Sequence, residues 1–169
     1  MKKLFLFTVL LAFALSASAQ FFTYDGITYR ITSDIKLTVE VDKGLNSPIV
    51  TIPSTVIGND HKPYTVTSIG DFAFSYYTNL TEITIPNTVT SIGVHAFEYC
   101  RLTNVTIPNS VTTIGDYAFW KCYRLTYISL PNSIKRIGEC TFCDCINLTN
   151  VTIPNTVTSI GNSAFIGCI

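Results

Sequence analysis

Four of the six cysteines occupy one position of a regular pattern. Each lies seven residues after a recurring glycine, where an earlier unit has Tyr77; the four are Cys100, Cys122, Cys145 and Cys168. A position that accepts both Tyr and Cys indicates inward packing, because a buried free cysteine behaves as a small hydrophobic side chain. Neighbouring positions would lie about 5 Å apart, within disulfide reach. We predict buried thiols here, with disulfides along the series as the alternative.

A second group of cysteines, Cys140, Cys143 and Cys145, lies within a single unit. A zinc site usually needs four ligands, often as two Cys-x-x-Cys-like pairs or with histidines. No second pair occurs, and His61 and His95 belong to other units. We therefore predict no metal site. A local disulfide that involves Cys140 or Cys143 remains open if the chain is exported, because exported proteins meet oxidising conditions.

The sequence offers no recognisable catalytic constellation. Serines and threonines are abundant but fall in repeated positions, and no Gly-x-Ser-x-Gly motif, phosphate loop or paired-carboxylate motif occurs. His95 lies at a variable position, where we predict a loosely packed side chain. Acidic residues are spread thinly, whereas a solenoid that cleaves polysaccharide would need clustered charges. We expect a protein that is not an enzyme and has no cofactor.

The amino-terminal segment 1–19 has the pattern of an export signal. Lys2 and Lys3 precede the apolar run 4–15, which is shorter than the roughly 20 residues that span a bilayer. Ala17 and Ala19 then form a small-x-small cleavage motif. We predict a signal peptide over 1–19 and a secreted or cell-surface protein; an amino-terminal membrane anchor is the alternative. No later apolar run is long enough to predict a transmembrane segment.

The charge balance excludes one class of partner. Eleven basic residues match eleven acidic ones, and removal of Lys2 and Lys3 leaves nine against eleven, a net charge of −2. Nucleic-acid binding depends on a basic excess that neutralises phosphates. We therefore expect no nucleic-acid partner, and the same shortage argues against a polybasic membrane patch.

The recurring glycines define the repeat that must position all these residues. They are Gly70, Gly93, Gly115, Gly138 and Gly161, whose position numbers rise in nearly equal steps. In each unit, apolar residues alternate with polar ones in a short strand that ends at a proline. After the glycine, the unit continues through a small residue and a phenylalanine, where we predict one helical turn. We also expect the glycine to have a backbone conformation that other residues avoid.

Residues 20–49 do not fit the repeat. Asp25-Gly26 between two apolar runs predicts a hairpin, and the alternation over 36–41 predicts a strand. We interpret 20–49 as a β-rich amino-terminal cap and 50–169 as a solenoid of about five coils, the last incomplete. The first coil has an insertion whose segment 58–63 should be a hairpin tip. Because the sequence stops midway through a coil, we expect a truncated or fragmentary gene product; a natural short form that pairs through the open edge is the alternative.

The unit V-T-S-I-G-x-x-A-F-x-x-C-x-x-L-T-x-V-T-I-P-N resembles the BspA-like leucine-rich-repeat family, also called the Treponema pallidum type, and the cap resembles that of Bacteroidetes members. The matching stretches lie within residues 50–169. The resemblance implies an α/β leucine-rich-repeat solenoid with short parallel β-strands and a one-turn helix in each coil of about 23 residues. It also implies a surface-exposed or secreted protein, similar to adhesins that bind host matrix proteins such as fibronectin and fibrinogen.

We expect a ligand to meet the outward strand positions of the concave sheet. We predict a ligand-binding column there, rimmed by two arginines that precede the strands: Glu82, Asn104, Tyr127 and Asn150, with Arg101 and Arg124. The neighbouring column of Thr and Ser is expected to be structural. We expect the partner to be a host matrix or cell-surface protein or a glycan, bound in adhesion. The alternative is a structural spacer or truncated fragment without its own ligand.

Overall fold

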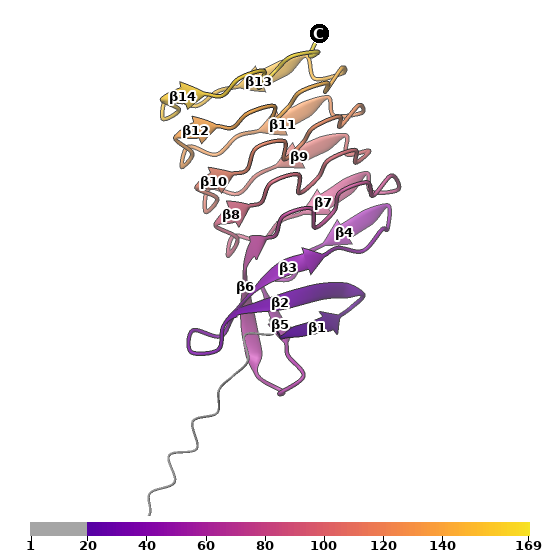
Figure 1. Ribbon diagram of the computed structural model, residues 1–169, viewed down its shortest axis with the longest axis vertical. Coiled ribbons are helices and arrows are strands. Elements are labelled where there is room, and N and C mark those ends of the chain that lie inside the picture. The colour runs from indigo at the N-terminus through magenta and orange to yellow at the C-terminus, as the bar shows by residue number, and fades with distance from the viewer. Residues whose placement is uncertain (1–19) are drawn as a thin grey trace, which may run out of the picture.

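A computed structural model describes residues 20–169 of the chain. The predicted signal peptide, with Ala17 and Ala19, lies outside the described residues. The described chain is a column of stacked coils above a β-rich base (Figure 1). Within it, no helix is long and apolar enough to cross a membrane.

The base contains three antiparallel strands, β1 (Phe21–Tyr24), β2 (Ile27–Ser33) and β3 (Thr38–Lys43). Asp25 and Gly26 connect the first two with φ values of 50° and 78°, so the predicted hairpin is confirmed. The strand predicted over 36–41 is also present, displaced to 38–43. The buried faces of these strands share a core with the coils, because side chains in strands alternate between two faces.

The base joins the stack through β6 (Pro63–Ile69), which pairs in parallel with β3. β6 also pairs antiparallel with β5 (Thr55–Ile57), and 58–62 connects the two strands. The inserted hairpin predicted in the first coil is therefore confirmed. The Gly70 N–H donates to the Val41 carbonyl at 2.8 Å, which continues the pairing into the first coil.

Each coil contributes a short parallel strand to each of two sides of the column (Figure 1). The first series, here called the strand side, is β4 (Ile49–Thr51), β7 (Glu82–Thr84), β9 (Asn104–Thr106), β11 (Tyr127–Ser129) and β13 (Asn150–Thr152). The second series is β8 (Ser91–Ile92), β10 (Thr113–Ile114), β12 (Arg136–Ile137) and β14 (Ser159–Ile160).

The space between the two sides is filled by repeated side chains. Phenylalanines stack face to face, with ring centroids 5.2 to 5.6 Å apart, through the series Phe74, Phe97, Phe119, Phe142 and Phe165. The cysteine series packs beside them, and each thiol donates to a phenylalanine carbonyl of the preceding coil. For example, Cys122 Sγ lies 3.1 Å from the Phe97 oxygen. All six cysteines are free in the structure, and the inward position predicted for the series is confirmed.

The predicted one-turn helices are wrong: no residue in 20–169 is helical, and the segments form consecutive turns. In the first full coil, Ala73 N–H donates to Gly70 and Ser75 N–H to Phe72, as turns require. The intervening donors bond to the next coil instead, with Phe74 N–H 2.8 Å from the Ala96 oxygen. N–H groups that would bond within a helix therefore bond to the neighbouring coil instead.

The expected role of the repeated glycines is also wrong. None of the five has a positive φ; the positive φ values are found two and six residues later, as at Phe72 and Tyr76. Gly93 instead lacks room for a side chain: a Cβ there would lie 2.6 Å from the backbone N of Asp71 and C of Gly70. Close approach of neighbouring coils therefore explains the glycine.

Candidate binding surfaces

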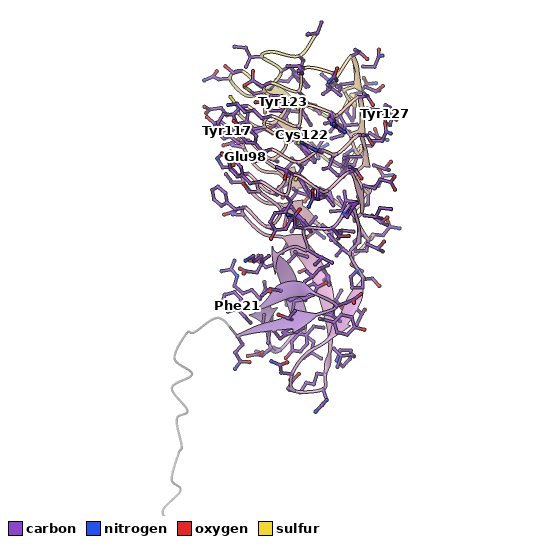
Figure 2. All side chains as sticks on the ribbon, turned by 90° about the vertical axis from the view of Figure 1, so that its right-hand side faces the viewer. Phe21, Glu98, Tyr117, Cys122, Tyr123 and Tyr127 are labelled. Atoms are coloured by element: carbon purple, nitrogen blue, oxygen red, sulfur yellow. The ribbon has the colours of Figure 1, made fainter. Side chains whose placement is uncertain are left out.

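Seven aromatic side chains cover one side of the first three coils; we call this surface the aromatic face. Its members are Phe72, Tyr76, His95, Tyr99, Tyr117, Trp120 and Tyr123. Figure 2 shows Tyr117 on the opposite side of the column from Tyr127, which belongs to the strand side. The molecule thus has two separate surfaces to consider.

Two columns of stacked rings form the aromatic face. In the first, His95 lies between Phe72 and Tyr117, with ring centroids 4.8 Å away on each side and planes within 9° of parallel. In the second, Tyr76 and Tyr99 stack at 4.7 Å. These residues are two and six positions after the repeated glycines, so the spacing of coils sets the spacing of rings. His95 is therefore held between two rings, and the prediction that it packs loosely is wrong.

Trp120 lies between the two columns. Its ring meets those of His95, Tyr99 and Tyr117 edgewise, at centroid distances of 5.7 to 6.0 Å. The Lys121 ammonium lies 4.6 Å from the centre of the Trp120 ring, a cation–π contact. Lys121 also donates to the Tyr99 hydroxyl at 2.8 Å, which lowers the pKa of Tyr99. Trp120 therefore ties the two columns into one surface.

Two carboxylates, Glu98 and Glu139, lie beside the polar ends of these rings. Glu98 is buried, accepts a hydrogen bond from Ser75 Oγ at 3.1 Å, and has Oε2 3.0 Å from His95 Nδ1. The geometry of the His95 contact does not satisfy a hydrogen bond, so this nitrogen is buried without a hydrogen-bond partner. Tyr117 donates to Glu139 at 2.7 Å, and this bond is the largest cause that raises the pKa of Tyr117 to about 12. The rings are fixed in place before any partner arrives.

The aromatic face presents ring edges and hydroxyl groups to solvent. Phe72 and Tyr76 are 57% and 59% exposed, and Tyr123 is 39% exposed. Phe72 and Tyr76 each stack on one neighbouring ring, so one flat surface of each is covered. Tyr and Trp are enriched at the centres of protein interfaces, where an apolar body and a polar tip are used together.

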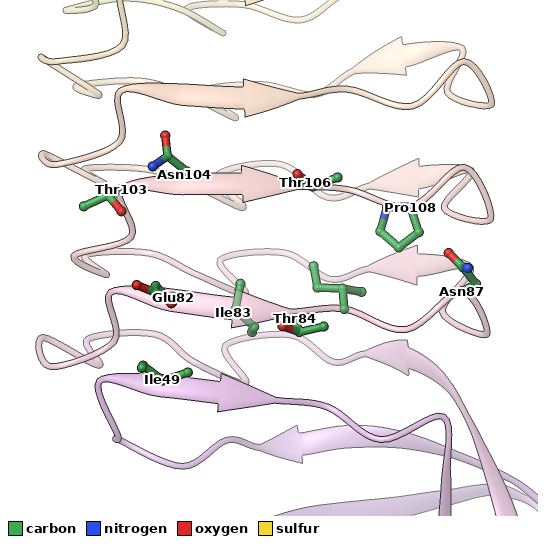
Figure 3. A pocket seen from close by; sticks show the side chains of 10 residues that line it. Ile49, Glu82, Ile83, Thr84, Asn87, Thr103, Asn104, Thr106 and Pro108 are labelled. Atoms are coloured by element: carbon green, nitrogen blue, oxygen red, sulfur yellow. The ribbon is translucent and has the colours of Figure 1, made fainter.

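The predicted ligand-binding column lies together on the strand side. Asn104 pairs in register with Tyr127, and Tyr127 with Asn150; Glu82 on β7 precedes them in the column. All four side chains are exposed. A shallow groove of about 480 Å³ lies over β7 and β9, lined by Glu82 and Asn104 (Figure 3). No aromatic side chain lines this groove.

The predicted rim arginines lie beside the aromatic face. Arg101 and Arg124 line a cleft of about 330 Å³ together with Tyr99 and Tyr123. The structure therefore brings these arginines to tyrosine side chains that sequence reasoning did not select. Guanidinium groups beside hydroxyl groups suit a partner that offers carboxylates, because arginine binds carboxylate oxygens with two parallel hydrogen bonds.

Sequence reasoning missed the aromatic face because it treated the position of His95 as variable between coils. The available signal was that two repeat positions are aromatic in successive coils. One position has Phe72, His95 and Tyr117, and the other has Tyr76 and Tyr99. Read down the repeat, these positions are aromatic in the early coils and small or polar later. Among the described residues, no group of three or more His, Cys, Asp or Glu side chains could hold a metal ion.

Comparison with known proteins places the coils in a family. Residues 53–169 match the family model of the BspA type leucine-rich repeat region, with six copies of the repeat. No curated protein matches the chain significantly. The matched segment covers well over half of the chain, and it includes the aromatic face and strands β7 to β13 of the strand side.

Solved structures have the same fold. The leucine-rich repeat protein of T. pallidum is 28% identical with a TM-score of 0.78, over 88% of this chain and 68% of that chain. A leucine-rich cell surface protein from Faecalibacterium prausnitzii is also 28% identical, with a TM-score of 0.53, over 90% of this chain and 53% of that one. The pneumococcal vaccine antigen PcpA, 22% identical with a TM-score of 0.63 over 89% and 48%, shows the fold alone. The chain spans about half the length of these last two proteins.

Proposed function

Because the chain belongs to the BspA-type leucine-rich-repeat family, we propose that it is a secreted or cell-surface binding protein without catalytic activity, and that it mediates adhesion through a protein partner. One observation carries the proposal: the aromatic face, a preorganised surface of stacked rings. Support for the location comes from the export signal predicted over 1–19 and from the surface relative in Faecalibacterium prausnitzii.

The geometry of the rings favours a protein over a glycan. A sugar binds aromatic side chains mainly by laying its C–H bonds on an exposed ring face, which carries the negative part of the ring quadrupole. Both faces of the His95 ring are covered, by Phe72 and Tyr117 at 4.8 Å. Tyr76 and Tyr99 cover one face of each other at 4.7 Å. Ring edges, hydroxyl groups and the Lys121 ammonium suit backbone carbonyls and carboxylates of a protein surface.

Rigidity also supports a binding role. A partner that meets the aromatic face would not have to order it, because ring stacking and the bond from Tyr117 to Glu139 already fix side chains there. Ordering of flexible side chains typically costs about 0.5–1.5 kcal/mol each on association. Preorganisation lowers this cost and so strengthens binding for a given area of contact.

The test measures binding of the purified chain to immobilised fibronectin, to fibrinogen and to a glycan array. Tyr76→Ser combined with Tyr123→Ser removes two exposed members of the aromatic face. We expect this double variant to weaken binding to a matrix protein at least about tenfold, since central aromatic residues each contribute about 2 kcal/mol or more.

Tyr127→Ser is the matched control, because Tyr127 is 49% exposed on the opposite side of the column. It should bind like the unaltered chain. The reverse pattern would place the ligand on the column of Glu82, Asn104, Tyr127 and Asn150. Binding to glycans alone would contradict a protein partner, and no binding to any probe would favour a structural spacer without a ligand.

A further inference from the structure

We propose that Cys140 and Cys143 form a redox site, at which a disulfide closes across a single turn beside the aromatic face. Cys140 and Cys143 are the first and last residues of a four-residue turn, closed by the Cys143 N–H, which donates to the Cys140 carbonyl at 3.1 Å. The ends of such a turn have Cα atoms less than about 7 Å apart, and disulfides bridge Cα separations of about 4.4–6.8 Å.

The two thiols are neighbours. Burial, and next the adjacent Cys140 thiol, raise the pKa of Cys143 to about 12. Cys140 is partly exposed, whereas Cys143 is 8% exposed. An incoming reagent therefore reaches Cys140 first. Cys143 is the resolving cysteine, the thiol that attacks the mixed disulfide formed on Cys140.

Three of the remaining cysteines differ in their surroundings. The thiols of Cys100, Cys122 and Cys145 are buried and donate to backbone carbonyls at 3.0 to 3.1 Å. Burial raises the pKa of Cys100 to about 12, and that of Cys122 well above its usual value. Reactive thiols need both access and ionisation. These cysteines thus lack the access that Cys140 has.

The site lies at the end of the aromatic face. Cys140 occupies the position that Tyr117 has in the preceding coil, and Cys143 occupies that of Trp120. Tyr117 N–H bonds to Glu139 and Lys121 N–H bonds to the Cys143 carbonyl, both at 2.9 Å, so the two coils are in direct contact here. A disulfide would fix the turn from Cys140 to Cys143, which lies next to Tyr117, the last ring of the first column.

The oxidant is a low-molecular-weight disulfide, such as oxidised glutathione, or the disulfide of an oxidoreductase. The Cys140 thiol loses its proton and attacks one sulfur of the reagent, which releases one reagent thiol and leaves a mixed disulfide on Cys140. The Cys143 thiol then loses its proton, attacks the Cys140 sulfur and expels the second reagent thiol. Two protein thiols are oxidised by two electrons, and one reagent disulfide is reduced to two thiols.

The test treats the folded chain with oxidised glutathione without denaturant and measures intact mass and non-reduced peptide maps. We expect loss of two hydrogen atoms and a cross-link that joins Cys140 to Cys143. Cys143→Ala should stop at the glutathione adduct on Cys140, and Cys140→Ser should resist the reagent. Cys168→Ser, a partly buried member of the other series, is the control and should form the same cross-link.

Two results would overturn the proposal: a glutathione adduct that persists on Cys140 of the unaltered chain, or a cross-link that joins Cys143 to another cysteine. Circular dichroism shows whether each variant is folded. The map of the unaltered chain decides the pairing even if a variant fails to fold. The outcome does not depend on whether the aromatic face binds a partner.

Discussion

Gly93 has no side chain because the preceding coil leaves no space for one. A Cβ at this residue would lie 2.5 Å from Asp71 Oδ1 and 2.6 Å from two backbone atoms. Backbone atoms cannot rotate away as a flexible side chain can, so the coils would have to separate. The same shortage of space recurs at Gly115 and Gly161, where a Cβ would lie 2.5 and 2.6 Å from backbone nitrogen of the preceding coil.

At this scale we expect Gly93→Ala to lower the free energy of unfolding by about 1–3 kcal/mol, the usual cost of overpacking. Urea unfolding followed by circular dichroism measures the change. The control is Val94→Ala, because Val94 is the next residue and is 37% exposed; it should stay within about 0.5 kcal/mol. Equal effects of both substitutions would contradict steric exclusion at Gly93.

Each coil is an element that cannot bury its own side chains. Phe97 has one ring face on Phe74 and the other on Phe119, both at centroid distances of 5.2 Å, so neighbouring coils supply most of its contacts. Backbone bonds follow the same rule, as Phe97 N–H donates to Ala118 of the next coil at 2.8 Å. Stability therefore depends on interfaces between coils as much as on the coils themselves.

We expect Phe97→Ala to lower the free energy of unfolding by about 3–5 kcal/mol, because the cavity would open between two coils at once. Phe72→Ala is the matched comparison. Phe72 is 57% exposed and stacks on one ring only, so its removal should cost about 1 kcal/mol. Chemical unfolding of both variants tests the difference, and similar losses would show that the phenylalanine stack does not dominate coil stability.

The base and the coils form one continuous molecule. Val41 is fully buried on β3, and its carbonyl accepts from Gly70 at 2.8 Å in the first coil. Gly44 donates to Ala73 at 2.7 Å, and the Tyr77 hydroxyl donates to Gly44 at 3.1 Å. No break in the described core separates the base from the stack, so both should unfold together.

Trp120, the single tryptophan, lies in the coils and reports their unfolding separately from the base. We expect Val41→Ala, in the base, to lower the free energy of unfolding by about 2 kcal/mol. The unfolding midpoint measured by Trp120 fluorescence should fall together with the midpoint measured by circular dichroism. Ile35→Ala should change neither, because Ile35 is 97% exposed. An unchanged fluorescence midpoint in Val41→Ala would show that the base unfolds alone.

The repeating unit, its register and its core residues could be predicted from the amino-acid sequence alone. Regularly spaced glycines, with Phe97 and Cys100 at fixed distances after one of them, identified which side chains point inward, because only stacked copies can bury such a pattern. The hairpin at Asp25-Gly26 was equally local, since its turn chemistry is contained in two residues.

The contacts between neighbouring coils could be seen only in the folded structure. It gave turns in place of helices, because donors such as Phe74 N–H bond to the next coil. It gave the glycines a steric role, and it built the aromatic face by bringing His95 and Tyr117, which belong to successive coils, to a ring separation of 4.8 Å. Each of these depends on the distance between coils, which no single repeat contains.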